Sequence, residues 1–217
     1  MPDTPRPHWE PPVPVPVAYL RQFHYFSRMA DKVRDLPGAF VECGVGHGTT
    51  FAMLAFLARA QKRTLYGFDS FEGFPEPSEA DRSWRNPQQE EWRVRQAEVW
   101  ELLSDTGLLY GPVKDWPILR HGFFRETLRE EDPRLIALLH LDCDLHDSYR
   151  DALAYLFPRV VAGGIVMFDE YREFSKSHPD EEKWPGATKA ILEYLTPLGL
   201  RPERDVVAKK WFVVKEA

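Results

Sequence analysis

Two short apolar segments limit what this chain can fold into. They are 135–141 (LIALLHL) and 164–168 (GIVMF), and both lack Asp, Glu, Lys and Arg. An unbroken apolar run of this length is typical of a strand that is buried on both faces of a sheet. Weaker patterns of the same kind predict further strands at 39–43, 64–68, 116–121 and 211–214.

Between these strands, apolar residues recur at helical spacing. This spacing predicts helices at 19–36, 49–59, 90–103, 148–156 and 187–195. In the third of these helices, Trp92 and Trp100 fit the face that packs on the core. Strands that alternate with helices predict an α/β fold, with a mostly parallel sheet and helices on both faces. Ligands of such sheets bind at the edge where the carboxyl ends of the strands meet.

The first 17 residues, MPDTPRPHWEPPVPVPV, differ in composition from everything that follows. A stretch so rich in proline favours an extended conformation and forms neither a helix nor a central strand. We therefore expect 1–17 to be an N-terminal arm and 18–217 to form a single domain, which the chain length suits. The arm and the apolar helix after it are compatible with a homo-oligomer, either a dimer or a larger assembly.

Charge and cysteine content restrict the partners and the compartment. The formal net charge is −6, so no overall basic field favours nucleic acid or an anionic membrane. No apolar run is long enough to span a bilayer, and the N-terminus lacks the apolar core of a signal peptide. Two cysteines, Cys43 and Cys143, are too few for a disulfide framework. The simplest interpretation is a soluble, cytoplasmic protein.

A glycine-rich turn joins the first predicted strand to the next helix in VECGVGHGTT, residues 41–50. Glycines at 44, 46 and 48 let the backbone turn tightly and approach a ligand, and the helix N-terminus offers N–H groups to an anion. The spacing differs from the G-x-G-x-x-G pattern of dinucleotide-binding proteins. Glu42 would repel a pyrophosphate but could pair with an ammonium group. The turn therefore favours an amino-acid-like ligand over the cofactor of an NAD-dependent dehydrogenase.

Asp69 ends the second predicted strand, where an acidic residue binds ribose hydroxyls in folds of this kind. A nucleoside joined to an amino acid describes S-adenosylmethionine, so we predict this cofactor. The alternative is a glycine turn that only packs helix on strand.

Four carboxylates follow the two apolar strands: Asp142, Asp144, Asp169 and Glu170. At one edge of a parallel sheet they would repel each other, and a divalent cation such as Mg²⁺, Mn²⁺ or Ca²⁺ would relieve the repulsion. Metal-bound hydroxyl groups lose their protons more readily, which would activate an alcohol as a nucleophile.

Asp142 and His146 are the candidate general bases for that proton. The structural alternatives stay open for their neighbours. Asp144 and Asp147 are better explained as caps of the helix that starts near Ser148. His47, His121 and His140 are better explained as structural residues.

Five segments carry a family resemblance: FVECGVGHGTT, LYGFDSFEGFP, HGFFRETL, LLHLDCDLHDSY and GGIVMFDEY. In this order the chain resembles the macrocin O-methyltransferase family, which acts on sugar hydroxyls in antibiotic biosynthesis. The resemblance implies a Rossmann-like class I methyltransferase fold, a seven-stranded sheet, and a divalent metal, usually magnesium, beside the cofactor.

The resemblance also implies roles for individual residues. Glu42, Gly44 and Thr50 would contact the methionine part of the cofactor, Ser70 and Phe71 would lie near the adenosine, and Gly122 near the adenine. The complete cofactor set is Glu42, Gly44, Val45, Gly46, Thr50, Asp69, Ser70, Phe71, Gly122 and Asp142. The metal ligands would be Asp142, Asp169 and Glu170. Three features depart from the family pattern: the GVGHG turn, the longer carboxylate of Glu170, and His146 in place of an aromatic residue.

The predicted function is therefore methyl transfer to a hydroxyl of a sugar or other small-molecule acceptor, assisted by a divalent metal. A metal-independent methyltransferase of the same fold is one alternative, and a non-catalytic cofactor-binding domain is another. Two long polar loops, 74–86 and 171–185, flank the predicted site. We expect them to become ordered over the acceptor.

Overall fold

The computed structural model describes residues 16–109, 116–129, 132–173 and 182–216. The predicted arm lies outside the described residues except for Pro16 and Val17, the second of which already begins a helix. The separation into an arm and a domain therefore stays a prediction.

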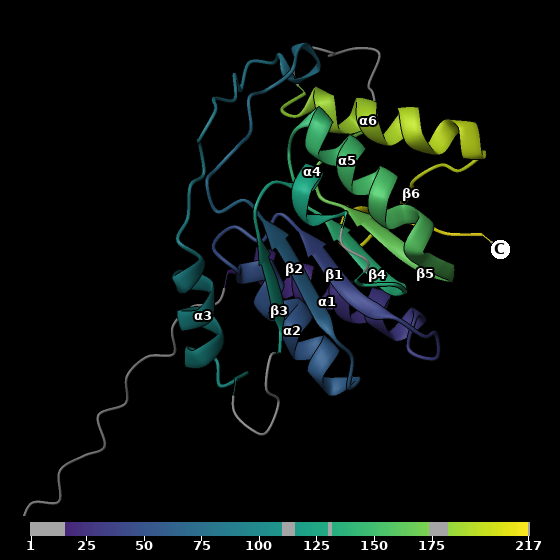
Figure 1. Cartoon of the computed structure of the whole chain (residues 1–217). Helices are drawn as coiled ribbons and strands as arrows, with labels where there is room; N and C mark the ends of the chain where they lie inside the picture. The colour runs from purple at the N-terminus through teal and green to yellow at the C-terminus, as the bar shows by residue number, and fades with distance from the viewer. Residues whose placement is uncertain (1–15, 110–115, 130–131, 174–181, 217) are drawn as a thin grey trace, which may run out of the picture.

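A seven-stranded sheet forms the centre of the molecule, in the order β3-β2-β1-β4-β5-β7-β6 (Figure 1). Its strands are β1 (Ala39–Cys43), β2 (Leu65–Asp69), β3 (Ile118–His121), β4 (Ile136–Leu141), β5 (Val160–Phe168), β6 (Glu203–Arg204) and β7 (Trp211–Val214). Strands β1 to β5 are parallel, and β7 runs antiparallel to both β5 and β6. The predicted Rossmann-like α/β fold is confirmed.

Helices cover both faces of this sheet. Their bounds are α1 (Val17–Lys32), α2 (Thr49–Ala60), α3 (Gln96–Asp105), α4 (Phe124–Thr127), α5 (His146–Leu156) and α6 (Pro185–Leu195). Side chains of α1, α2 and α3 pack in one hydrophobic cluster with the sheet, and those of α4, α5 and α6 pack in the other (Figure 1). Every residue of β1 and β4 is buried, as expected for central strands between two helical layers.

Two of the sequence predictions differ from the structure between β2 and β3. The predicted helix at 90–103 begins only at Gln96. Backbone hydrogen bonds between Phe74 and the pair Glu90 and Glu91 replace its first turns, and Glu90 and Trp92 have positive φ angles. Trp92 is 58% exposed, so its prediction as a core residue is wrong. Trp100 does pack against the core, as predicted.

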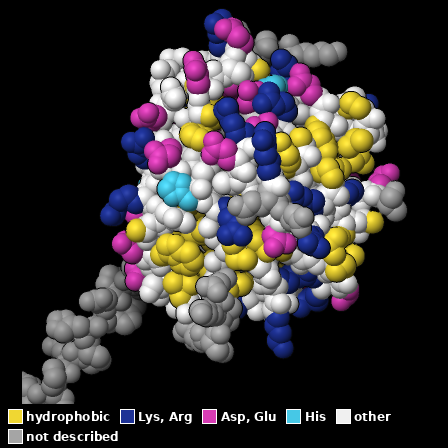
Figure 2. All heavy atoms as spheres, in the orientation of Figure 1, with side chains coloured by type: hydrophobic (Ala, Val, Ile, Leu, Met, Phe, Trp, Pro, Cys, Tyr) yellow, Lys and Arg dark blue, Asp and Glu magenta, His cyan; other side chains and the backbone are white. Residues whose placement is uncertain are grey.

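In the described part of the chain, no helix is long and apolar enough to cross a membrane. Acidic and basic side chains are interspersed over the face seen in Figure 2. The absence of a nucleic-acid partner and the formation of a homo-oligomer both stay predictions.

Candidate active site

A cavity of about 430 Å³ opens at the carboxyl ends of the parallel strands. The glycine turn, the ends of β2, β4 and β5, the start of α5 and two loops supply its walls. The predicted site residues that line it are Gly44, Val45, Gly46, Thr50, Asp69, Ser70, Asp142, Asp169 and Glu170. The topology thus brings together at one edge most of the residues that the sequence singled out.

The glycine turn fits closely against the loop that follows β4. Gly44 has a φ of +87°, and a Cβ atom there would lie 1.7 Å from the backbone oxygen of Asp142. Gly46 has a φ of +51° and no atom within 4 Å of where its Cβ would be. Gly44 therefore lets the turn pack directly against the backbone that follows β4, while Gly46 leaves open space on the cavity side.

Asp69 connects the glycine turn to the loop after β2. Its Oδ2 accepts a hydrogen bond from the Gly46 N–H at 2.8 Å, and its Oδ1 accepts one from the Phe71 N–H at 2.7 Å. The carboxylate is thus fixed at the cavity wall with further acceptor capacity, since each oxygen can accept more than one hydrogen bond. Phe71 is itself buried, with its ring edge-on to His121 at 5.4 Å, and Gly122 donates its N–H to the Asp69 carbonyl. Neither Phe71 nor Gly122 lines the cavity.

Glu42 is fully buried behind the glycine turn. Its Oε1 lies 2.8 Å from Nδ1 of His140, on the neighbouring strand β4. Burial alone would lower the pKa of His140, but the hydrogen bond and charge of Glu42, together with the charges of Asp142 and Asp169, outweigh it, so the pKa lies above its usual value. Oε2 of Glu42 makes no hydrogen bond within the described residues.

A group of potential metal ligands lies at the ends of β4 and β5. Ligand atoms of His140, Asp142 and Asp169 lie within 4.8 Å of one another. Burial and the charge of Asp169 raise the pKa of Asp142 to about 8. Burial acts in the same sense on Asp169, but the Lys210 ammonium and His140 outweigh it and lower the pKa of Asp169.

Two contacts in this group were not foreseen from the sequence. The ammonium of Lys210, which directly precedes β7, donates a hydrogen bond to Asp169 Oδ1. Glu170 lines the cavity beside the group, and its Oε2 lies 2.5 Å from the hydroxyl of the buried Tyr149. Glu170 is therefore held by a residue of α5. The three residues whose ligand atoms lie close together are His140, Asp142 and Asp169, so His140 stands where the sequence predicted Glu170.

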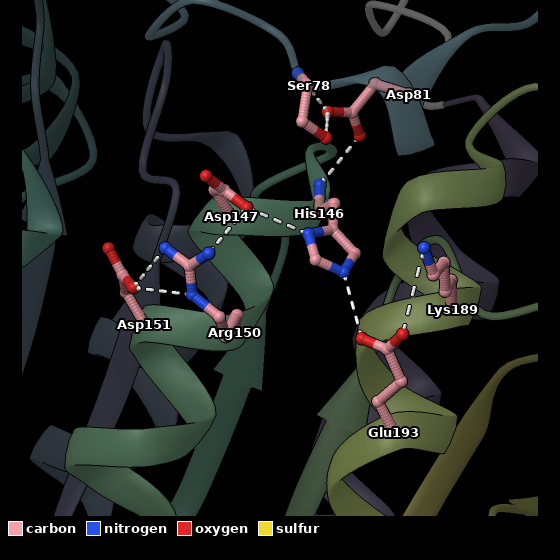
Figure 3. Close-up of polar contacts among 8 residues, drawn as sticks. All are labelled: Ser78, Asp81, His146, Asp147, Arg150, Asp151, Lys189 and Glu193. Atoms are coloured by element: carbon pink, nitrogen blue, oxygen red, sulfur yellow. Dashed lines mark hydrogen bonds and ion pairs between the residues drawn. The ribbon is translucent and has the colours of Figure 1, made fainter.

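His146 lies outside the cavity, on the side of α5 that faces α6. Its Nδ1 is 2.8 Å from Asp147 Oδ1 and its Nε2 is 3.0 Å from Glu193 Oε2 (Figure 3). Both ring nitrogens are thus engaged by carboxylates, and the ring does not line the cavity. Of the two candidate bases, only Asp142 is at the site.

The N-terminus of α5 is capped from a distant loop. Asp81, only 2% exposed, accepts hydrogen bonds from the His146 N–H at 2.7 Å and from the N–H and hydroxyl of Ser78 at 2.8 Å (Figure 3). A Cβ at Gly186, at the start of α6, would lie 1.9 Å from the same carboxylate. The expectation that Asp144 and Asp147 cap this helix is therefore wrong, because Asp81 already occupies that position.

Replacing Asp81 should lower the unfolding free energy of the protein measurably. Asp81→Ala removes the cap of α5 and leaves the half-buried Ser78 N–H without its acceptor, so we expect a loss of about 1–2 kcal/mol in unfolding free energy. Urea denaturation measures it. Glu79→Ala is the matched control, because Glu79 lies on the same short segment and its side chain pairs with the exposed Arg82. Equal stabilities for the two variants would show that the cap contributes nothing.

Both predicted lid loops contribute to the cavity wall. Phe74, Pro75 and Glu76 come from the first loop, and Lys183 and Trp184 from the second. The loops also touch: the rings of Phe74 and Trp184 meet edge to face at 5.8 Å, and the Ser83 hydroxyl donates to the Lys183 carbonyl at 2.9 Å. Residues 174–181 lie outside the described residues, so the ordering of these loops over an acceptor stays a prediction.

Comparison with known proteins identifies relatives for most of the chain. The family model described as macrocin-O-methyltransferase (TylF) matches residues 18–189. The chain is 32% identical over 145 residues to demethyldecarbamoylnovobiocin O-methyltransferase of Streptomyces niveus, covering 63% of this chain and 54% of that protein. It is also 32% identical over 140 residues to 8-demethyl-8-(2,3-dimethoxy-alpha-L-rhamnosyl)-tetracenomycin-C 4'-O-methyltransferase of Streptomyces olivaceus, with the same coverages of 63% and 54%. The chain thus spans about half the length of the curated relatives it matches.

A solved structure agrees with this assignment. The calicheamicin methyltransferase CalS11 superposes with a TM-score of 0.74 at 25% sequence identity, covering 90% of this chain and 79% of that one. The likeness shows a class I methyltransferase fold. With a family model that matches well over half of its length, the chain belongs to the macrocin O-methyltransferase (TylF) family.

Proposed function

We propose that this protein is an S-adenosylmethionine-dependent O-methyltransferase that acts on a hydroxyl group of a sugar or another small natural-product-like molecule. The observation that carries the proposal is one cavity in which the glycine turn, Asp69 and Asp142 meet. The names of the relatives describe O-methylation, in one case of a rhamnosyl-bearing compound, which supports the same chemistry here.

The cofactor-binding residues suit S-adenosylmethionine at both ends. The unpartnered Oε2 of Glu42, behind the turn, fits a neighbouring ammonium group, and Asp69 retains acceptor capacity for ribose hydroxyls. The open space at Gly46 lets a ligand approach the backbone closely. When bound, this cofactor supplies an electrophilic methyl group on a sulfonium.

Asp142 is the residue we assign as general base. Its carboxylate lines the cavity beside the glycine turn, where it can take the proton of an acceptor hydroxyl as the oxygen becomes a nucleophile. The walls formed by Phe74 and Trp184 help to exclude water and to orient the acceptor.

A divalent metal fits the donor set of His140, Asp142 and Asp169, with Glu170 adjacent. Carboxylate oxygens suit Mg²⁺, and the imidazole would widen the choice to transition metals. Such an ion would lower the pKa of a bound acceptor hydroxyl. The ammonium of Lys210 at Asp169 favours a second candidate, a metal-independent enzyme in which this lysine partly balances the carboxylate charge. Full activity in EDTA would select the second candidate.

The test is calorimetric titration of S-adenosylmethionine, first with magnesium and then with EDTA. We expect binding in both conditions, because the glycine turn and Asp69 need no metal. Asp69→Asn should weaken the affinity by about tenfold to a hundredfold, since it loses a charge-assisted acceptor for the ribose.

The matched control for this titration is Glu72→Gln. Glu72 lies in the same loop but pairs with the exposed Arg93, and its variant should bind like the wild type. Absence of binding at millimolar cofactor would overturn the proposed function. A separate heat of magnesium binding, lost in Asp169→Asn, would support the metal-assisted form.

A further inference from the structure

A lysine beside the last strand of the sheet reaches the carboxylates at the ends of β4 and β5. Phe168 of β5 pairs with Trp211 of β7 in the antiparallel register, so Asp169 and Lys210 stand opposite each other just beyond that pair. The Lys210 ammonium forms an ion pair with Asp169 Oδ1. The two side chains are only 28% and 24% exposed, so water and salt screen this pair less than a pair on the open surface.

The backbone that carries Lys210 is fixed by the turn before β7. Asp205, at the start of this turn, is 5% exposed, and its Oδ1 accepts two backbone N–H groups of the turn. The Asp205 N–H is donated to the Lys210 carbonyl at 2.8 Å, and Arg28 of α1 binds Asp205 Oδ2 at 2.9 Å. The fold therefore holds this lysine beside Asp169.

The oxygen that Lys210 binds also faces the other potential metal ligands. Asp169 Oδ1 lies 4.0 Å from Nε2 of His140, and ligand atoms of His140, Asp142 and Asp169 lie within 4.8 Å of one another. An ammonium and a divalent cation at the same ligands repel each other and compete for the same oxygen lone pairs. A metal that binds here must therefore share Asp169 with Lys210 or displace the lysine.

We propose that Lys210 competes with the divalent cation for Asp169, so that it lowers the affinity of the site for the metal. This inference rests on the metal-assisted form of the proposed function. Its consequence is a site that binds a divalent cation weakly and reversibly, with the ammonium balancing the charge of Asp169 when the metal leaves. The dependence of the enzyme on the cation is then set by a residue outside the ligand set.

The experiment measures the affinity of the EDTA-treated and dialysed protein for two ions. Binding of Mn²⁺ is followed by the EPR signal of the free ion, and binding of Mg²⁺ by calorimetry. Lys210→Met keeps an unbranched side chain and removes its charge. A neighbouring charge changes the affinity of a carboxylate for a proton by roughly tenfold to a thousandfold, so we expect Lys210→Met to bind either ion at least about tenfold more tightly than the wild type.

The control variants separate a local effect from one of net charge. Lys209→Met alters the exposed neighbour and changes the net charge by the same amount, so it should bind the ions like the wild type. Lys210→Arg keeps the positive charge and should also resemble the wild type. Lys210→Gln removes the charge but keeps a hydrogen-bond donor, so it should gain affinity even if Lys210→Met fails to fold. Adding Asp169→Asn to either neutral Lys210 variant should abolish the gain, which assigns the binding to this site.

The possible outcomes are distinct. A gain in affinity in the neutral Lys210 variants, with Lys209→Met and Lys210→Arg like the wild type, would support the competition. Unchanged affinity in the neutral variants, no ion binding in any variant, or an equal gain in Lys209→Met would overturn it. Titration of S-adenosylmethionine separates this failure from that of the proposed function. If the wild type binds the cofactor while the neutral variants gain no metal affinity, only the role of Lys210 is lost.

Discussion

Asp142→Asn is expected to reduce kcat for methyl transfer by about three orders of magnitude, the middle of the range that a positioned general base contributes. The amide has the shape of the carboxylate but cannot take the proton of an acceptor hydroxyl. Asp142 is the one candidate base that lines the cavity, since His146 lies between α5 and α6 with both ring nitrogens engaged. Single-turnover kinetics with a glycoside that the wild type methylates would measure the loss.

The control for Asp142→Asn is Asp151→Asn. The Asp151 carboxylate also lines the cavity, but its Oδ1 is bound by the Arg150 guanidinium at 3.0 Å, so the substitution should change kcat only slightly. Cofactor affinity, measured with S-adenosylhomocysteine, should change by less than about tenfold in Asp142→Asn. A kcat close to that of the wild type in Asp142→Asn would remove Asp142 from the mechanism.

Gly44→Ala is expected to be among the most destabilising single substitutions in the chain. The added Cβ would lie 1.7 Å from the backbone oxygen of Asp142, and the backbone at Gly44 is left-handed. The conformation alone costs about 1–2 kcal/mol, and the steric overlap adds about 1–3 kcal/mol. No flexible side chain is available to give way, because the obstacle is main chain. The expected loss in unfolding free energy is therefore about 2–5 kcal/mol.

Gly199→Ala separates the two contributions. Gly199 has a φ of +72°, but nothing lies within 4 Å of the position that its Cβ would take, so this variant should lose only the conformational part. Urea denaturation of both variants gives the comparison. If both variants lose the same free energy of unfolding, the close contact between the glycine turn and the loop after β4 is not rigid. The arrangement of these two walls of the cavity would then need revision.

Much of the fold could be predicted from local patterns. Within the two apolar runs, residues 136–141 and 164–168 are buried, as their composition predicted, whereas Leu135 is 51% exposed. All five predicted helices and all six strands predicted from local patterns are present. β6 has no apolar pattern, because it consists of two exposed residues, Glu203 and Arg204, that pair at the edge with β7. The short helix α4 likewise contains no buried residue and gives no periodic signal.

The candidate site could be predicted less completely, because several of its contacts join distant parts of the sequence. Trp92 has helical spacing from Trp100, but the pairing of Phe74 with Glu90 and Glu91 turns that segment into a cavity wall. Lys210 reaches Asp169 only because β7 lies antiparallel to β5. A lysine in a polar loop gives no sequence signal for such a role. His140 gives no sequence signal for its role either, because an isolated histidine in an apolar run predicts a core residue. Its proximity to Asp142 and Asp169 follows from the sheet.

The sequence by itself determined the order of strands and helices, the glycine turn, and the edge of the sheet at which Asp69, Asp142, Asp169 and Glu170 emerge. These features depend on residue type and short-range spacing, which physical chemistry translates directly into local structure. Only the tertiary structure decided which side chains are engaged and which are free. Asp81 caps α5 from 65 residues away, which leaves Asp144 at the cavity and His146 outside it. Such choices follow from the packing of loops and helices onto the sheet, where many local arrangements compete for the same few hydrogen-bonding positions.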